Sequence, residues 1–130
     1  MTTRAKTAPK AAPKAKAKRA AAQPFLRFYH SDELRAKTLA VLAALEQASD
    51  PEKHRDTLAD LVAELTESGM DYYYLRALKL SKAGFVAEQS ARLAMSGAVK
   101  LISSVSRRFI VRMDSAQLLV VARHIRELAS

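Results

Sequence analysis

Residues 71–113, with the sequence DYYYLRALKLSKAGFVAEQSARLAMSGAVKLISSVSRRFIVRM, decide the fold. Apolar side chains recur in this stretch every three or four residues, the spacing of one face of an α-helix: Leu80, Ala83, Ala87, Ala91, Ala94, Ala98, Leu101, Val105, Phe109 and Met113. Polar and basic side chains repeat at the same spacing on the opposite face: Lys82, Gln89, Arg92, Ser96, Lys100, Ser103 and Arg107. The stretch is therefore predicted to be helical, with one face that packs against a partner and one basic face.

The length of this stretch limits how it can fold. One unbroken helix of 43 residues would extend about 65 Å, whereas a compact domain of about 100 residues has a radius of gyration of about 13 Å. The helix therefore either breaks, or projects and packs against another copy of the chain. The predicted break points are Gly84 and Ser96-Gly97, because glycine weakens a helix interior by about 1 kcal/mol relative to alanine.

Alanine dominates the predicted apolar face. Two helix backbones can approach closely along such a face, but each contact buries little area, so the packed length must be long. This pattern fits a helical hairpin or self-association, and an ordinary bundle core is the alternative. The predicted interface residues are Ala87, Ala91, Ala94 and Ala98, together with Tyr72 and Tyr73. The tyrosines combine apolar area with a polar tip, and the end of a bundle is the alternative place for them.

Capping signals predict two shorter helices before this stretch. Ser31 is a good N-cap for a helix over residues 32–48, since its hydroxyl can accept from an unpaired N–H of the first turn. Asp50 and Pro51 then begin a second helix, because proline suits the first helical position. This second helix is expected to end at Gly69.

A last helix is expected after the long stretch. Asp114 or Ser115 caps it, and Gln117 is placed as in a capping box. The three shorter helices each bury an apolar row: Leu34, Thr38, Val41, Leu42, Leu45; Leu58, Leu61, Val62, Leu65; and Leu118, Val121, Ala122, Ile125, Leu128. The predicted fold is all-α, a small bundle of four or five helices over residues 24–130, here called the helical body, and no sheet is expected.

The net charge of +9 is distributed unevenly. Residues 1–31 contain eight bases and no acid, residues 32–71 ten acids and four bases, and residues 72–130 ten bases and three acids. Acids recur every three or four residues on the second predicted helix: Glu52, Asp56, Asp60, Glu64 and Glu67. Because like charges at this spacing repel, a basic partner is expected from the N-terminal block, from the basic face of the long stretch or from another subunit. A plainly solvated face is the alternative.

Residues 1–23 form a low-complexity basic tail of lysine, alanine and proline. Since the tail contains nothing large enough to bury, it is expected to be disordered when free. The run TAPKAAPKAKAKR over residues 7–19 resembles the tails of histone H1 and the H1-like tails of some bacterial nucleoid and granule proteins. The resemblance covers only about the first 22 residues. It implies sequence-independent contact with nucleic-acid phosphates, which agrees with the counterion release that lysine binding causes.

The predicted nucleic-acid-binding residues are cations of this tail and of the long stretch: Lys6, Lys10, Lys14, Lys16, Lys18, Arg19, Arg92, Lys100, Arg107 and Arg108. Two alternatives remain for the tail. One is an extension without a partner, and the other is an organelle transit peptide, against which its lysine and proline content and scarce serine argue. The aromatic segment 24–30 is expected to dock on the helical body, with stacking on single-stranded bases as the alternative.

No pattern in the chain indicates catalysis. His30, His54 and His124 fall in three different elements, and the chain has three glycines, no cysteine and no phosphate loop, nucleophile motif or metal-ligand pair. We therefore expect no enzyme activity, metal or cofactor. No run is long and apolar enough to span a membrane, and no apolar signal core is found at the N-terminus. A cytoplasmic protein is expected, bacterial nucleoid association included, with organelle targeting disfavoured.

Two classes of function fit these features. The first is a non-enzymatic protein whose tail binds nucleic acid non-specifically, while its helical body forms a homo-oligomer or docks a helical partner and so gathers several tails. The second is a peripheral protein whose long amphipathic segment lies on an anionic membrane or storage granule. It resembles the phasins, some of which combine alanine-rich amphipathic helices with H1-like tails. An alanine-rich face favours the first class, because interfacial helices usually carry bulky apolar side chains.

Overall fold

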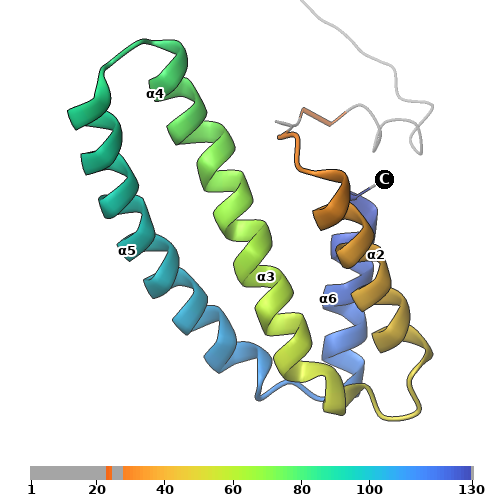
Figure 1. The fold of residues 1–130 in the computed structure, drawn as a ribbon. Helices are drawn as coiled ribbons and strands as arrows, with labels where there is room; N and C mark the ends of the chain where they lie inside the picture. The colour runs from red at the N-terminus through yellow and green to blue at the C-terminus, as the bar shows by residue number, and fades with distance from the viewer. Residues whose placement is uncertain (1–22, 25–27, 130) are drawn as a thin grey trace, which may run out of the picture.

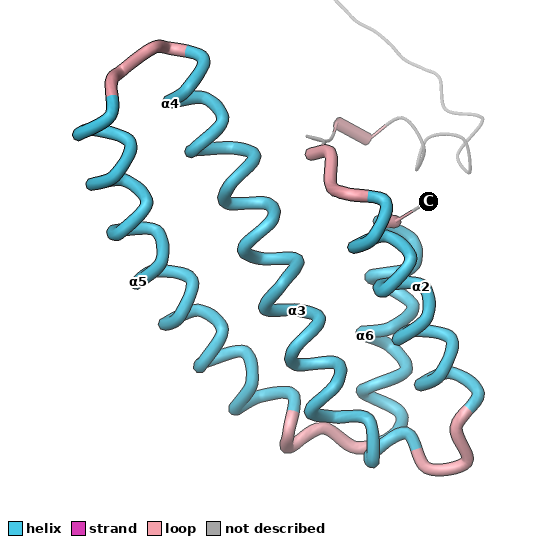
Figure 2. The backbone as a smooth tube through the Cα atoms, viewed as in Figure 1, coloured by secondary structure: helices cyan, strands magenta, loops and turns pink. Residues whose placement is uncertain are grey.

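The computed structural model describes residues 23–24 and 28–129, and that part of the chain is largely helical and contains no strand (Figure 2). Its elements are α2 (Asp32–Gln47), the 3-10 turn η2 (Pro51–His54), α3 (Arg55–Met70), the π-helical segment η3 (Asp71–Leu75), α4 (Arg76–Leu80), α5 (Phe85–Ile110) and α6 (Ser115–Leu128). Because α3, η3 and α4 follow one another without a break, four helical rods result, and the all-α prediction is confirmed. The predictions for residues 1–22 and 25–27 lie outside the described residues.

The N-terminal caps predicted from the sequence are present. The Ser31 hydroxyl oxygen accepts a hydrogen bond from the Leu34 N–H at 3.0 Å. In the capping box of α6, Asp114 Oδ1 accepts from the Gln117 N–H at 2.8 Å, and Gln117 Oε1 accepts from the Asp114 N–H at 3.0 Å. Asp50 caps η2 at its proline. Because such caps satisfy N–H groups that have no partner inside the helix, they determine where these elements begin.

The predicted end of the second helix at Gly69 is wrong. α3 continues through Gly69 to Met70, and the rod runs on through η3 and α4 to Leu80. Packing along the rod explains this: the Phe28 ring lies 3.8 Å from the position that a Cβ of Gly69 would take, and α5 packs along α3. One glycine weakens a helix interior by only about 1 kcal/mol, and this packing offsets that loss.

The rod turns back at residues 81–84, at the first of the two predicted break points. Gly84 has a φ of 104°, a conformation that is open to glycine and rare for other residues. α5 then runs antiparallel to the rod, so the two form a long helical hairpin (Figure 1). Ser96-Gly97, the second predicted break point, lies inside the unbroken α5.

The hydrophobic core lies between α2, α3 and α6 and includes only the last residue of α5. Its buried apolar side chains are Leu42, Leu45, Leu58, Ala59, Leu61, Ile110, Leu118 and Ala122. The predicted core positions on α2, α3 and α6 are confirmed by this set and by the partly buried residues around it, with one exception. Leu128 is 72% exposed. At that end of α6 the half-buried residue is Ala129, whose carbonyl oxygen accepts a hydrogen bond from Arg35 at 2.6 Å.

α5 packs mainly on α3, on the side away from α2 and α6 (Figure 1). Its half-buried positions mark the face towards α3: Glu88, Ala91, Met95, Ala98, Val99, Ser103, Ser106 and Arg107. The predicted direction of the apolar face is therefore wrong. Ser103 and Arg107 lie on the packed side, whereas Leu101 and Phe109 are 66% and 64% exposed. The rotation follows from two tertiary contacts, because Ile110 enters the core and Arg107 reaches acids of α3.

Candidate interaction surfaces

Arg107 of α5 bridges two acids of α3. Its Nη1 donates to Asp56 Oδ1 at 3.2 Å, and its Nη2 pairs with Asp60. All three side chains are more than 40% exposed, so solvent screens these ion pairs, and pairs of this kind contribute about 0.2–1 kcal/mol. The acidic row of α3 thus has a basic partner from α5, which was one of the sequence alternatives. Arg107 is held within the hairpin by this contact.

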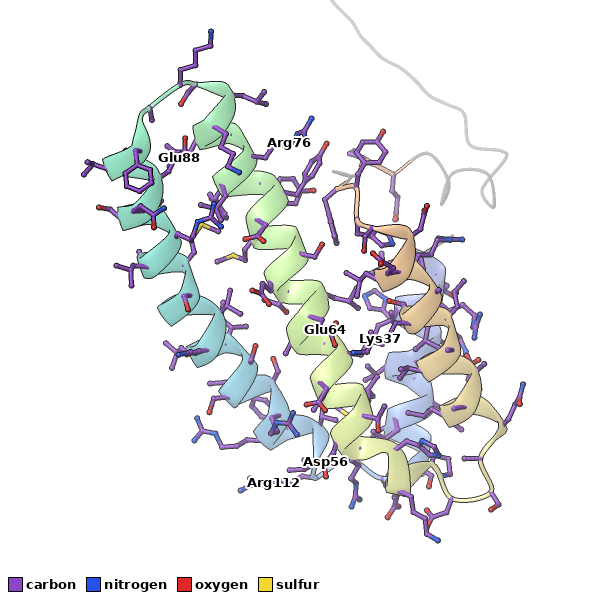
Figure 3. All side chains as sticks on the ribbon, in the orientation of Figure 1. Lys37, Asp56, Glu64, Arg76, Glu88 and Arg112 are labelled. Carbon is purple, nitrogen blue, oxygen red and sulfur yellow. The ribbon has the colours of Figure 1, made fainter. Side chains whose placement is uncertain are left out.

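Lys37 of α2 pairs with Glu64, a further acid of the same row, and the two side chains point towards each other between α2 and α3 (Figure 3). At the start of the row, Arg55 Nη2 lies 3.2 Å from Glu52 Oε1. Lys37 was not among the residues predicted from the sequence. Its place beside the buried Thr38 is the signal that would have found it, because a long cationic side chain at the edge of a buried face can reach the next helix.

The other predicted cations of the long stretch do not form one patch. Arg92 lines a small groove beside η3, together with Asp71. Lys100 and Arg108 are exposed on α5. Lys100 and Arg108 are eight residues apart, about 12 Å along the helix axis, and Arg107 between them in the sequence is occupied by two carboxylates.

Tyr72 and Tyr73 make contacts inside the chain. The Phe28 ring lies 6.2 Å from the Tyr73 ring, and the Tyr29 ring lies 5.8 Å from the Tyr72 ring in edge-on geometry. The Arg76 guanidinium carbon is 5.4 Å from the centre of the Tyr72 ring. Aromatic pairs of this kind contribute about 0.5–1.5 kcal/mol beyond the area they bury. The predicted docking of the segment before α2 is confirmed for its described part, and these predicted interface tyrosines hold it.

Glu46 and Arg126 join α2 to α6 through two parallel hydrogen bonds. Arg126 Nη2 donates to Glu46 Oε1 at 2.6 Å, and Arg126 Nε donates to Glu46 Oε2 at 3.1 Å. These bonds hold the pKa of Glu46 below its usual range and raise the pKa of Arg126, while partial burial opposes both shifts. This bidentate geometry is specific to arginine and a carboxylate, and it fixes the pairing of α2 with α6.

The described residues contain an open groove but no assembled metal-binding set. An open groove of about 660 Å³ lies between the start of α2 and the end of α3, and its acids include Glu33, Glu67 and Asp71. No group of three His, Cys, Asp or Glu side chains among the described residues is arranged to hold a metal ion. No helix in the described part is both long enough and apolar enough to cross a bilayer.

The face of α5 that points away from α3 carries exposed apolar and small side chains. We call it the outer face of α5, and it consists of Val86, Ser90, Leu93, Ala94, Gly97, Leu101, Ser104 and Val105, together with the basic Arg108 one turn after Ser104. Leu93 is 76% exposed and Leu101 is 66% exposed. Of the predicted interface alanines, Ala91 and Ala98 are half-buried towards α3, whereas Ala87 and Ala94 are exposed. The alanine face is therefore divided between the hairpin and the surface.

No family model matches this chain, and no curated protein or solved structure is significantly similar to it. Function is therefore inferred from the charges and surfaces described above.

Proposed function

We propose that this chain is a non-enzymatic protein that binds nucleic acid without sequence specificity through its basic tail, and that its helical body gathers tails by forming a homo-oligomer or docking a helical partner. The observation that carries the proposal is the division of charge. Residues 1–27 hold eight bases and no acid, whereas residues 28–130 hold 14 bases and 13 acids. Four bases of the body are paired with its own acids, and the net positive charge of the sequence is concentrated in residues 1–27.

The physics of polyelectrolyte binding gives the proposal a measurable form. Each lysine or arginine that neutralises a phosphate releases condensed counterions, and the logarithm of the binding constant falls by about 0.9 per contact with the logarithm of salt concentration. The tail, residues 1–23, contains seven bases, so one fully engaged tail gives a slope of about −6 on duplex DNA. Two tails joined in one particle bind more tightly than one, because the second contact is intramolecular. A cytoplasmic site of action, bacterial nucleoid included, is part of this proposal.

Charge neutralisation of the tail tests the proposal without changing its length. The test variant replaces the predicted tail cations with glutamine: Lys6, Lys10, Lys14, Lys16, Lys18 and Arg19. The matched control replaces Arg92, Lys100 and Arg108 with glutamine and leaves the tail intact. Binding to a random-sequence duplex is followed by fluorescence anisotropy between about 50 and 200 mM salt. We expect the tail variant to lose most of the affinity and the salt slope, and the control to keep both. The reverse pattern would refute the proposal.

One observation favours the second function class, a phasin-like protein on a storage granule or anionic membrane. The outer face of α5 carries bulky Leu93 and Leu101, with the exposed Phe109 nearby, and bulky apolar side chains of this type support interfacial binding. Co-flotation of the full chain with anionic vesicles tests this alternative. The granule or membrane alternative would be favoured over nucleic-acid binding by two results together. The chain with the neutralised tail would still float with the vesicles, and the double variant Leu93→Glu, Leu101→Glu would not.

A further inference from the structure

We infer that the outer face of α5 is a self-complementary interface, through which two copies of the chain pair with their α5 helices antiparallel and Gly97 on the two-fold axis. This inference rests on the proposed self-association of the helical body and names its surface and geometry. Three independent features of α5 lead to it: an apolar face that nothing in the described chain covers, a symmetric arrangement of side chains, and a glycine that the hairpin does not require.

The first feature is exposure. α5 packs on α3 along one side only, and the apolar residues of its outer face lie in solvent over most of the helix length. Val86, Leu93 and Leu101 are 77%, 76% and 66% exposed. Scattered exposed residues need no explanation, but large apolar residues repeated along one helix face mark it as a candidate interaction surface.

The second feature is symmetry about Gly97. In an antiparallel pair with Gly97 on the axis, residues equally far before and after Gly97 face each other. Leu93 and Leu101 lie four residues to either side, and Ser90 and Ser104 lie seven residues to either side. Offsets of four and seven residues return to the same helix face. A second copy therefore places leucine against leucine and hydroxyl against hydroxyl, and it brings Arg108 opposite Val86 and Lys100 opposite Ala94.

The third feature is Gly97 itself. Glycine weakens the interior of a helix relative to alanine, so a position that keeps it calls for a steric reason. A Cβ added at Gly97 would meet nothing within 4 Å, and the hairpin therefore supplies no such reason. A second helix that crosses α5 at Gly97 would supply this reason, because small residues at the crossing allow the two backbones to approach closely. Ala94, one turn away, is also small.

Charge and composition select a second copy over the other candidates for this face. The basic tail is disfavoured because its seven bases would lie beside Lys100 and Arg108, and like charges repel. In the antiparallel pair each of these two cations faces an uncharged residue. An apolar surface such as a granule is disfavoured because Ser90, Gly97 and Ser104 interrupt the middle of the face. In the antiparallel pair the two serines come opposite each other across the axis, where one hydroxyl can donate to the other.

The expected association is weak. Residues 86–108 span about 33 Å of helix, and a contact band about 10 Å wide along it covers about 330 Å² per copy, less than the roughly 800 Å² of a standard interface. The total of about 660 Å² lies below the roughly 1,000 Å² of a stable specific interface, so the pair is expected to be weak and transient. In each copy α3 lies between α5 and α2 (Figure 1). A pair joined through its α5 helices therefore holds the two α2 helices on opposite sides of the dimer. Their N-termini, to which the tails are joined, are then placed to contact two separate segments of nucleic acid.

Disulfide trapping tests the geometry, and the absence of cysteine from the sequence makes single replacements clean. A disulfide needs Cα atoms about 5.5 Å apart. In the full chain, Gly97→Cys should cross-link to itself under mild oxidation, because only a residue on the axis meets its own copy. Ser104→Cys alone should not cross-link, but a mixture of the Ser90→Cys and Ser104→Cys chains should give heterodimers. Ser104→Cys homodimers with no mixed product would show a parallel pair and overturn the inference.

Sedimentation between about 1 and 200 µM measures the association itself. Leu101→Glu should weaken it at least about tenfold, since the carboxylate would be buried against leucine. Leu128→Glu, at an equally exposed leucine of α6, is the matched control and should leave it unchanged. The inference would be overturned if the chain were monomeric throughout this range. It would also be overturned if the Leu101→Glu variant lost vesicle binding but dimerised as well as the unmodified chain. Duplex binding through the tail is measured separately, so a full chain that stays monomeric but still binds duplex through its tail rejects this interface and retains the tail proposal.

Discussion

Replacing Gly97 by alanine should separate the stability of the folded chain from its self-association. The structure contains Gly97 inside α5, and an added Cβ would meet no atom within 4 Å. The substitution therefore adds helix propensity without a clash. We expect the monomer to gain about 0.8–1 kcal/mol, which for a domain of about 100 residues raises the Tm by about 4–8 °C. The same methyl group lies at the proposed helix crossing, so the dimer should weaken.

The two other glycines of the chain provide matched controls, because the structure predicts a different outcome for each. At Gly69 an added Cβ would lie 3.8 Å from the Phe28 ring, an ordinary contact, so Gly69→Ala should also stabilise the chain and leave association unchanged. Gly84 has a φ of 104°, and alanine there is strained by about 1 kcal/mol or more. Gly84→Ala should therefore destabilise the fold.

Urea denaturation of the three variants at a protein concentration well below the dissociation constant gives their monomer stabilities, and sedimentation gives their association. The reasoning would be refuted if Gly97→Ala lowered monomer stability, since the open space around Gly97 would then be wrong. If Gly97→Ala dimerised as well as the unmodified chain, the proposed close crossing of two α5 helices at Gly97 would be wrong. A stabilising Gly84→Ala would contradict the placement of the hairpin turn.

Three further predictions follow from contacts between helices. Ile110→Ala should destabilise the fold by about 2–5 kcal/mol in urea denaturation, because Ile110 is the core side chain of α5 and its removal leaves a cavity. Arg107→Gln and Asp60→Asn should each lower stability by about 0.2–1 kcal/mol, with a double-mutant cycle showing coupling between them; strict additivity would deny the ion pair. Glu46→Gln should flatten the pH dependence of stability. The pKa of Glu46 is lowered in the folded chain, so its pairing with Arg126 stabilises the fold above the unfolded pKa of about 4.3. This stabilisation is lost as the pH falls through the folded pKa. Urea midpoints measured from pH 6 to pH 3 should fall more steeply for the unmodified chain, and equal slopes would argue against the bidentate pair.

Local signals predicted the helix starts and one turn. Ser31, Asp50 and Asp114 cap helices through contacts that span two or three residues, so the sequence alone determines them. The break at Gly84 was one of two break points that glycine predicted, and the sequence did not choose between it and Ser96-Gly97, which lies inside α5. The buried rows of α2, α3 and α6 followed from helical spacing, since each of these helices contributes one face to a common core.

Tertiary contacts decided what the sequence left open or predicted wrongly. Gly69 stays helical because packing along the rod outweighs its low propensity. The rotation of α5 depends on Arg107 meeting Asp56 and Asp60 and on Ile110 entering the core. α5 carries apolar residues over more than half of its circumference, so spacing alone could not identify the packed side. The symmetry of the outer face became apparent only after that side was known.

The central claim is that tails bind nucleic acid and the helical body gathers them in pairs. The salt dependence of duplex binding, measured for the full chain, the chain with its tail neutralised to glutamine and Leu101→Glu, tests it most directly. We predict a steep slope for the full chain and a slope near −6 for the monomeric Leu101→Glu chain with its single tail of seven bases. The chain with the neutralised tail keeps only Arg4 of these seven and should show a slope of about −1. An undiminished slope after neutralisation, or identical binding by Leu101→Glu and the full chain above the dimer dissociation constant, would contradict it.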